Sequence, residues 1–173
     1  SKGILKKPQK IGFVFQNYAV FPWLSVKGNI SFGLENNNKT VEHYLKMIDL
    51  EYKKYNYPFE LSGGQIQRVA IARTLAANPD LILMHEPFGA LDVFTRDKMQ
   101  KWLLDIWQKE RKTILFVTHY IDEAIFLADR ILILKDKKIK KEFKIHLKRP
   151  RNERIKFDKK FIDLKKRIIN IIN

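Results

Sequence analysis

The sequence contains no cysteine among its 173 residues. Disulfide bonds and thiolate metal sites are therefore excluded, and this composition agrees with a reducing compartment. No apolar run approaches the roughly 20 residues that a membrane-spanning helix requires. Any role at a membrane would therefore depend on a partner that spans it.

The chain has few acidic residues, with 19 Asp and Glu against 34 Lys and Arg. Its formal charge is therefore +15. Residues 135–173 alone hold 16 Lys and Arg against 5 Asp and Glu, so most of the excess lies in this tail. A nucleic-acid-binding domain is expected to gather basic residues on one face of its folded core. We interpret the tail as a solvated lysine-rich surface, with contact to anionic lipid or nucleic acid as the alternative.

Apolar residues make up 45% of the chain, which is enough for the packed core of one domain. Short apolar runs predict strands at residues 11–15, 81–84, 114–117, 131–134 and 139–145. Apolar residues at helical spacing predict helices near residues 41–48, 62–77, 92–109, 121–128 and 161–171. Strands that alternate with helices predict an α/β fold whose parallel sheet is covered on both faces. Ligands bind such sheets at the carboxyl ends of the strands.

Several motifs follow one another between residues 16 and 119. They are Gln16 after the first strand, Leu61-Ser62-Gly63-Gly64-Gln65 before a helix, His85-Glu86-Pro87 after an apolar run, Asp92, and His119 at the end of the next apolar run. A lone glutamine or histidine would mean little, and a histidine at a strand end is more often structural. Together, in this order, the motifs resemble the ATP-binding cassette ATPase family from near the start of the chain to about Lys135.

The resemblance implies a partial P-loop NTPase (RecA-like) core with a parallel sheet. It also implies a partial ATPase domain at 1–135 with a helical subdomain at about residues 17–77. The remaining residues, 136–173, are the basic tail, which the apolar spacing at 161–171 predicts to end in an amphipathic helix. The family's phosphate loop, G-x-x-x-x-G-K-[ST], is missing, since none of the seven glycines begins this pattern. We therefore expect the phosphate-loop strands to be absent and a longer protein to include this chain. We also expect a sheet edge to be exposed and otherwise buried apolar surface to be left uncovered.

The resemblance assigns the signature residues to ATP. Ser62, Gly63 and Gly64, together with Gln65, would bind the γ-phosphate of an ATP held by the other protomer. A helix N-terminus suits this task because its first amides lack intrahelical partners and carry the positive end of the helix dipole. The resemblance therefore implies a dimer of two ATPase subunits that encloses two nucleotides.

Four further residues receive roles from the same resemblance. Glu86 matches the catalytic base that polarises the attacking water, and His119 matches the switch histidine that contacts the γ-phosphate. Gln16 matches the residue that contacts Mg²⁺ and senses the transmembrane partner. Asp92 matches the loop that links the two ATP sites across the dimer.

His85 departs from the family, which has aspartate at this position to hold Mg²⁺. Imidazole is a poor ligand for Mg²⁺, which prefers oxygen donors, and it supplies no negative charge. We therefore expect weak binding of Mg-ATP and slow hydrolysis. A degenerate site and an altered codon are both open explanations for His85.

Local runs narrow the resemblance to the ATPases of nitrate, sulfonate and taurine importers. They are Phe15-Gln16-Asn17, Phe21-Pro22-Trp23-Leu24, Glu86-Pro87-Phe88-Gly89-Ala90-Leu91-Asp92, Leu115-Phe116-Val117-Thr118-His119, and Arg149-Pro150-Arg151. In such importers the segment corresponding to residues 17–30 forms the groove for a helix of the membrane subunit. Tyr18, Phe21, Pro22 and Trp23 would supply its apolar surface, unless they pack the domain's own core.

We interpret the chain as part of the ATP-binding and ATP-hydrolysing subunit of an importer for nitrate, sulfonate, taurine or a similar solute. Its expected partners are a second copy, transmembrane permease subunits and, indirectly, a periplasmic or lipoprotein solute-binding protein, at the cytoplasmic face of the membrane. No nucleic acid is expected as a partner. One alternative is a degenerate cassette that no longer hydrolyses ATP. Another is a soluble cassette protein acting on ribosomes or DNA, although this chain holds neither a second cassette nor a long coiled-coil insert.

Overall fold

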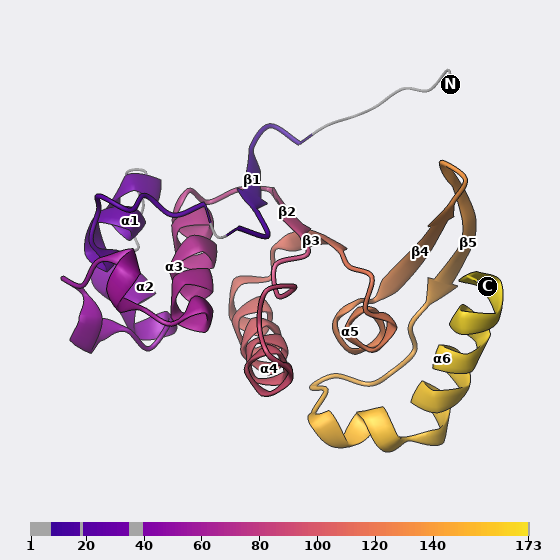
Figure 1. Cartoon of the computed structure of the whole chain (residues 1–173). Helices are drawn as coiled ribbons and strands as arrows, with labels where there is room; N and C mark the ends of the chain where they lie inside the picture. The colour runs from indigo at the N-terminus through magenta and orange to yellow at the C-terminus, as the bar shows by residue number, and fades with distance from the viewer. Residues whose placement is uncertain (1–7, 18, 35–39, 173) are drawn as a thin grey trace. The chain divides into compact units, whose positions relative to one another are not determined.

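The computed structural model describes residues 8–17, 19–34 and 40–172. The chain divides into two compact units, and each is described by itself (Figure 1). Unit 1 comprises Ser1–Arg96 and Glu110–Val117, and unit 2 comprises Asp97–Lys109 and Thr118–Asn173. Among the described residues, no helix combines the length and apolarity needed to cross a bilayer.

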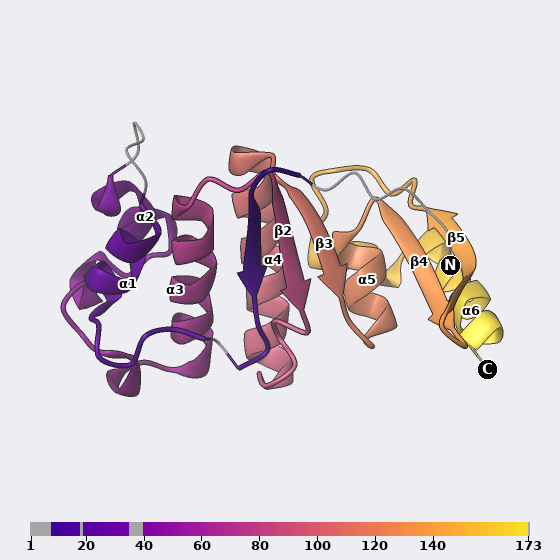
Figure 2. The ribbon, with the colours of Figure 1, turned by 90° about the horizontal axis from the view of Figure 1, so that it is seen from above.

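Unit 1 contains a parallel sheet of three strands. They are β1 (Ile11–Val14), β2 (Leu81–His85) and β3 (Thr113–Val117), in the order β1-β2-β3. Val14 pairs with Met84, and Met84 pairs with Phe116, so the strands end along one edge (Figure 2). The predicted α/β class and parallel sheet are confirmed. The residues that follow β1 and β2 are thereby placed next to each other.

The two faces of this sheet differ in exposure. Val14, Ile82 and Met84 point to one face and are buried. Side chains on the other face remain exposed, namely Phe13 (45%), Phe15 (48%), Leu115 (52%) and Val117 (45%). The expectation that both faces are covered is therefore wrong for the described residues, and the uncovered apolar surface that we expected is present. Because successive strand residues alternate between faces, apolar residues at every position place large side chains on both.

The helical part of unit 1 contains α1 (Val26–Gly33), α2 (Val41–Met47), the short helices η1 (Glu51–Lys53) and η2 (Pro58–Glu60), and α3 (Gly63–Ala76). Helices α1 and α3 approach closely at Gly33, because a Cβ atom there would collide with the backbone carbonyl of Arg73. The predicted stripe on α2 is confirmed, since Tyr44, Leu45 and Ile48 are buried. Burial, assisted by the charge of Glu110, raises the pKa of Tyr44 to about 12.

Unit 2 takes most of α4 (Val93–Glu110) and continues with α5 (Ile121–Leu127), β4 (Arg130–Lys135), β5 (Lys138–Lys144), η3 (Glu153–Phe157) and α6 (Lys159–Ile172). Strands β4 and β5 form an antiparallel hairpin. Its turn has positive φ at Asp136 (53°) and Lys137 (61°), as a tight two-residue hairpin turn requires. The predicted turn and last strand are thus confirmed.

Strand β4 is not the buried strand that its apolar sequence predicted. Only Ile133 is buried, whereas Leu132 is 40% and Leu134 is 70% exposed. The reason is that β4 pairs only with β5 among the described strands, in a two-stranded sheet. The domain boundary predicted after residue 135 falls within the turn of this hairpin, and the division at that point stays a prediction.

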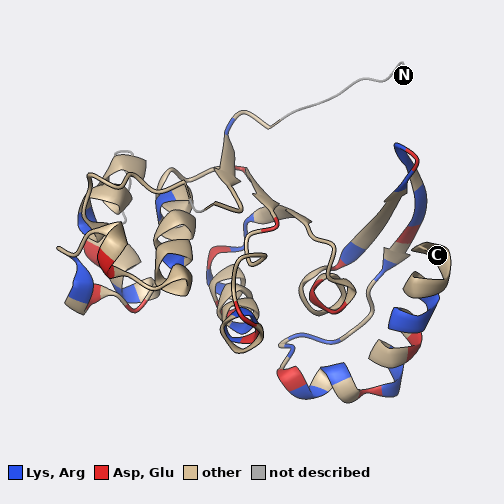
Figure 3. Cartoon of the chain, viewed as in Figure 1, with Lys and Arg blue, Asp and Glu red and all other residues tan. Residues whose placement is uncertain are grey.

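Helix α6 is amphipathic, as predicted. Phe161 and Ile168 are buried, while Lys159, Lys160, Lys166 and Arg167 are exposed. Lys and Arg recur along α6 and along the β4–β5 hairpin (Figure 3). Because α6 contacts α5, its apolar side packs within unit 2.

Candidate functional site

The signature residues form the N-terminus of α3. Ser62 is the N-cap, and its hydroxyl accepts a hydrogen bond of 3.4 Å from the amide of Gln65. The side chain of Gln65 in turn accepts a bond of 3.0 Å from the amide of Ser62, which completes a capping box. Gly63 and Gly64 occupy the first turn, whose amides have no intrahelical acceptor. The predicted capping role of Ser62 is confirmed, and the amides are suitably placed to bind an anion.

Gln65 also connects the signature turn to the preceding segment. Its Oε1 accepts a 3.4 Å bond from Lys53 Nζ, and its Nε2 donates one of 3.4 Å to the hydroxyl of Tyr52. These contacts hold the turn against η1. Gln65 therefore has a structural function that the sequence analysis missed, although the Ser-x-x-Gln spacing of a capping box was visible.

Glu86 follows the last residue of β2 and has a strained backbone. Its φ is +44°, a conformation that is uncommon for a residue with a side chain. Its amide donates a 2.8 Å hydrogen bond to the carbonyl of Val117, and its own carbonyl accepts one of 3.0 Å from Gly89. The backbone of Glu86 is thus fixed at the carboxyl end of the sheet, where ligands of such folds bind.

Gln16 and Glu86 converge at Gly89. A Cβ atom placed on Gly89 would lie 3.3 Å from Nε2 of Gln16 and 3.5 Å from Oε2 of Glu86. Glycine at position 89 therefore leaves room for both side chains. Gly89 belongs to the motif from Glu86 to Asp92, but residues 16 and 89 are far apart in sequence, so sequence spacing gives no signal for this convergence.

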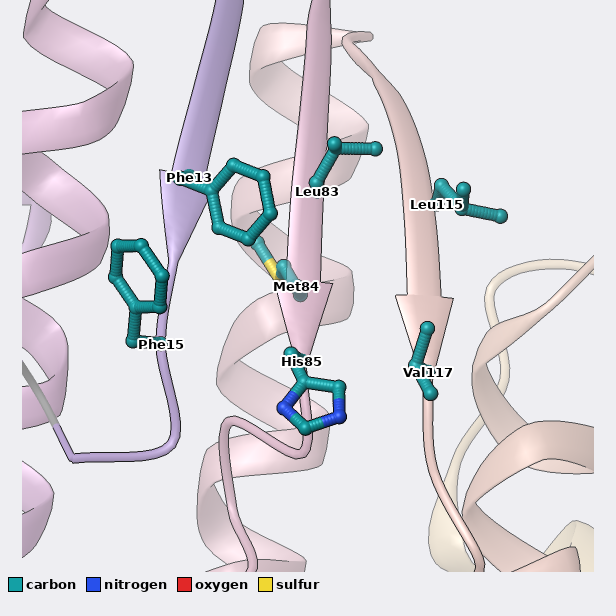
Figure 4. A pocket seen from close by; sticks show the side chains of 7 residues that line it. All are labelled: Phe13, Phe15, Leu83, Met84, His85, Leu115 and Val117. Carbon is teal, nitrogen blue, oxygen red and sulfur yellow. The ribbon is translucent and has the colours of Figure 1, made fainter.

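His85 lies on the exposed face of the sheet. It lines an open apolar hollow with Phe13, Phe15, Leu83, Leu115 and Val117, and Figure 4 shows its ring below the end of β2. Phe13 and Phe15 stack with their ring centroids 4.7 Å apart. The surroundings of the imidazole are thus mainly hydrocarbon.

The residues near His85 do not fit a magnesium site. The described part of the chain has no group of three or more His, Cys, Asp or Glu side chains that could hold a metal ion. Mg²⁺ requires oxygen donors in near-octahedral geometry, whereas His85 offers nitrogen. We therefore assign no step of the chemistry to a metal held by these residues, and the metal-binding roles of Gln16 and His85 stay predictions.

Asp92 caps α4, a local function beyond the one that the family resemblance implies. Its Oδ1 accepts a 3.0 Å bond from the amide of Thr95, and its carbonyl accepts one of 2.8 Å from Arg96. Hydrogen bonds from Thr95 lower the pKa of the Asp92 carboxyl. Arg96 also donates to the carbonyls of Phe88 and Leu91, at 3.2 and 2.9 Å. The loop from Glu86 to Asp92 is therefore held at its far end.

His119 lies in unit 2, in the turn between β3 and α5. It is exposed, and its ring packs against that of Tyr120 with centroids 4.0 Å apart. The amide of Tyr120 donates a 3.0 Å bond to the hydroxyl of Thr118. Whereas Gln16 and Glu86 are brought together in unit 1, His119 belongs to the other unit and Ser62 to a separate helix.

The loop between β1 and α1 presents aromatic side chains. Trp23 in this loop is 69% exposed, and Phe32 on the following helix α1 is 68% exposed, so neither packs in the core. Buried Asn29 fixes the loop, because it accepts from the amide of Phe21 at 2.8 Å and donates to the carbonyls of Phe21 and Leu24 at 3.1 and 3.0 Å. Tyr18, which was predicted to join this surface, lies outside the described residues. Sequence spacing gave no signal for the role of Asn29.

Arg73 supports the same loop from α3. Its Nη2 donates to the carbonyl of Ala19 at 2.5 Å, and its guanidinium lies 4.7 Å from the ring centroid of Phe21. Burial lowers the pKa of Arg73. The exposed aromatic surface is thus held by α1 and α3 and is available for contact with another protein.

Comparisons with known proteins agree with these features. An uncharacterised ABC transporter ATP-binding protein of Methanocaldococcus jannaschii is 47% identical over 93% of this chain and 62% of its own length. The aliphatic sulfonates import ATP-binding protein SsuB of Bacillus cereus is 42% identical over 96% of this chain and 67% of its own length. The chain thus spans about two thirds of the length of these curated relatives.

A solved structure gives the same result. An ATP-binding cassette, determined as a dimer in a post-hydrolysis state with ADP and Pi, has a TM-score of 0.65 and 38% identity over 79% of this chain and 63% of its own. The family profile described as ABC transporter matches residues 2–89. Because this profile matches about half of the chain, including the signature turn and Glu86, and the relatives match more than nine tenths of it at over 40% identity, the chain belongs to the ABC transporter family.

Proposed function

We propose that the protein containing this chain is the ATP-hydrolysing subunit of an importer for a small solute such as a sulfonate, with nitrate and taurine as further members of this solute group. The observation that carries the proposal is the convergence of Gln16 and Glu86 at Gly89. A strained glutamate at a strand end, beside an amide side chain, suits a residue that orients an attacking water. The aliphatic sulfonate relative supports the choice of solute.

In the proposed reaction each residue has one task. The carboxylate of Glu86 polarises the water that attacks the γ-phosphate, and the imidazole of His119 contacts that phosphate. The free amides at the N-terminus of α3 bind the γ-phosphate of ATP in a second copy of the protein, because they carry the positive end of the helix dipole. Asp92 connects the two sites of this dimer. The residues of this chain thus contribute to two nucleotide sites.

The test is ATP hydrolysis by the complete encoded protein with Glu86→Gln. This variant keeps the size of the side chain and removes the base, so we expect turnover to fall by at least about 100-fold with ATP binding retained. The matched control is Glu142→Gln, which changes an exposed carboxylate paired with Arg130 on the β4–β5 hairpin. If Glu86→Gln and the control hydrolyse ATP equally fast, Glu86 is not the base.

A second candidate function is nucleotide binding without rapid hydrolysis. The observation that favours it is His85 among apolar side chains, in the position where the family has a carboxylate. His85→Asp in the complete protein is then expected to raise turnover by about 100-fold or more. His146→Asp, at an exposed position, is the control. Unchanged turnover in His85→Asp would show that His85 does not limit the reaction.

The exposed aromatic loop is the proposed contact for a permease subunit. This partner would hold the protein at the cytoplasmic face of the membrane, and a solute-binding protein would act on the permease from the other side. Trp23→Ala is expected to weaken co-purification with the permease while ATP binding is kept. Phe157→Ala, which removes an aromatic side chain that is 82% exposed in unit 2, is the control. Intact co-purification of Trp23→Ala would contradict this assignment.

A further inference from the structure

Helix α5 begins immediately after the turn that carries His119. Tyr120 is its N-cap, and the carbonyl of Tyr120 accepts a 3.1 Å bond from the amide of Ala124. The helix has only seven residues, and so short a helix is not stable without tertiary contacts. The place of His119 in unit 2 therefore depends on what holds α5.

The C-terminal end of α5 is held by Arg151. Its side chain is 1% exposed, and Nη1 donates to the carbonyls of Phe126 at 3.0 Å and Ala128 at 2.8 Å. Carbonyls at the end of a helix lack intrahelical partners, so the guanidinium supplies donors that the helix itself cannot. Nη2 lies 3.4 Å from Oδ1 of Asp129, which partly balances the buried charge. Burial, and to a smaller extent the nearby positive charge of Arg149, lower the pKa of Arg151 to about 10, so the side chain stays protonated at neutral pH.

The middle of α5 is held by Lys156 through a chain of side chains. Glu123, 2% exposed, accepts a 3.1 Å bond from Nε2 of Gln100 on α4. Oε1 of Gln100 accepts from Nζ of Lys156 at 3.3 Å, and the same ammonium pairs with Asp97 at 2.8 Å. It also lies 5.0 Å from the ring centroid of Phe126. A buried chain of this kind fixes both helices, since each member depends on the next.

Both basic residues come from the segment between β5 and α6, which passes beside α5 in Figure 1. We propose that Arg151 and Lys156 are positioning residues for His119, acting through α5. The inference rests on the proposed function, in which His119 contacts the γ-phosphate. Two basic residues of the tail, Arg151 and Lys156, would thus have a role in the ATP cycle, because they hold helix α5, which follows His119.

The first experiment monitors the environment of His119 directly and does not require the protein to hydrolyse ATP. In the complete protein with Arg151→Met, we expect the NMR signal of the His119 imidazole to shift or broaden, and amide exchange in residues 121–128 to become at least about tenfold faster. Arg130→Met is the control, because Arg130 forms an exposed pair with Glu142. Lys156→Met, at a less buried site, provides a second variant should Arg151→Met not fold. An unchanged His119 signal and unchanged exchange in whichever of these folds overturn the proposal.

The second experiment measures kcat and KM for ATP. Arg151→Met is expected to lower kcat by about tenfold with KM for ATP nearly unchanged, and Arg151→Lys is expected to recover part of the loss. In a His119→Ala background the Arg151→Met change should have no further effect, because both act through the same imidazole. Additive effects in this cycle overturn the positioning role. If the wild-type protein does not hydrolyse ATP but Arg151→Met still alters the His119 signal, it is the proposed function that fails.

Discussion

Ser62 and His119 are both assigned to the γ-phosphate, yet the structure holds them in different ways. Ser62 is fixed by a capping box with Gln65, three residues away, and by contacts of Gln65 with Tyr52 and Lys53. His119 is followed by a helix whose anchors, Arg151 and Lys156, lie more than thirty residues further along the chain. The first arrangement is local and the second is long-range.

The two regions should therefore respond differently when one of their residues is substituted. Substituting an N-cap residue removes about one hydrogen bond, and the residues next to it in sequence stay in place. A buried network of charged groups leaves its remaining members without partners when one is removed, which costs considerably more. We therefore expect changes near α5 to affect stability more than changes at the signature turn.

The largest effect is expected for Glu123→Ala, which removes the buried acceptor of the α5 network. Gln100 loses its carboxylate partner, so the free energy of unfolding should fall by about 3 kcal/mol, as urea denaturation of the complete protein would measure. Glu123→Gln retains an acceptor and should lose only about 1 kcal/mol. Equal losses in the two variants would mean that the long-range network contributes little.

A smaller effect is expected for Ser62→Ala. Loss of the N-cap should lower the free energy of unfolding by about 1 kcal/mol, whereas Ser62→Gly should cost only a few tenths. The same denaturation experiment measures both, and the His119 NMR signal should not change in either variant. A loss as large as that of Glu123→Ala would remove the distinction between the two regions.

The smallest effect concerns the second local cap, at Asp92. Hydrogen bonds from Thr95 lower the pKa of Asp92 from its ordinary value of 3.8. An aspartate whose pKa is lowered by folding stabilises the protein above its unfolded pKa and loses this contribution as the pH falls through the folded value. Asp92→Asn keeps a capping oxygen but cannot titrate. The stability difference between wild type and Asp92→Asn should therefore shrink below pH 3.8, and a difference independent of pH would contradict the local role.

Much of the fold could be predicted because its signals are short. The apolar runs at residues 81–84 and 114–117 correspond to β2 and β3, and the stripe from Val41 to Ile48 corresponds to α2. The run at 131–134 forms a strand as predicted, but this strand is not buried as predicted. An apolar run specifies an extended segment without specifying which strand it pairs with, and pairing with β5 left Leu134 exposed.

The candidate site was likewise predicted only in part. The types and order of Gln16, Ser62, Glu86 and His119 were sufficient to predict the family, which the comparisons confirm. The positions of Gly89 and Arg151, and the contacts of Gln65 with Tyr52 and Lys53, were not predicted, because each depends on atoms that approach only after folding. The Arg-Pro-Arg run at 149–151 resembles the importer ATPases, but nothing in the sequence connects it to α5.

The cap at Ser62, the strand runs and the residue types of the site follow from the order of residues alone. They depend on hydrogen bonds and side-chain spacing within three or four residues, which the order of residues encodes directly. Long-range packing brings Gln16 and Glu86 together at Gly89, leaves one face of the β1–β3 sheet exposed, and places Arg151 and Lys156 against α5. Such contacts join residues distant in sequence, and their geometry arises from the packing of whole elements rather than from any local pattern.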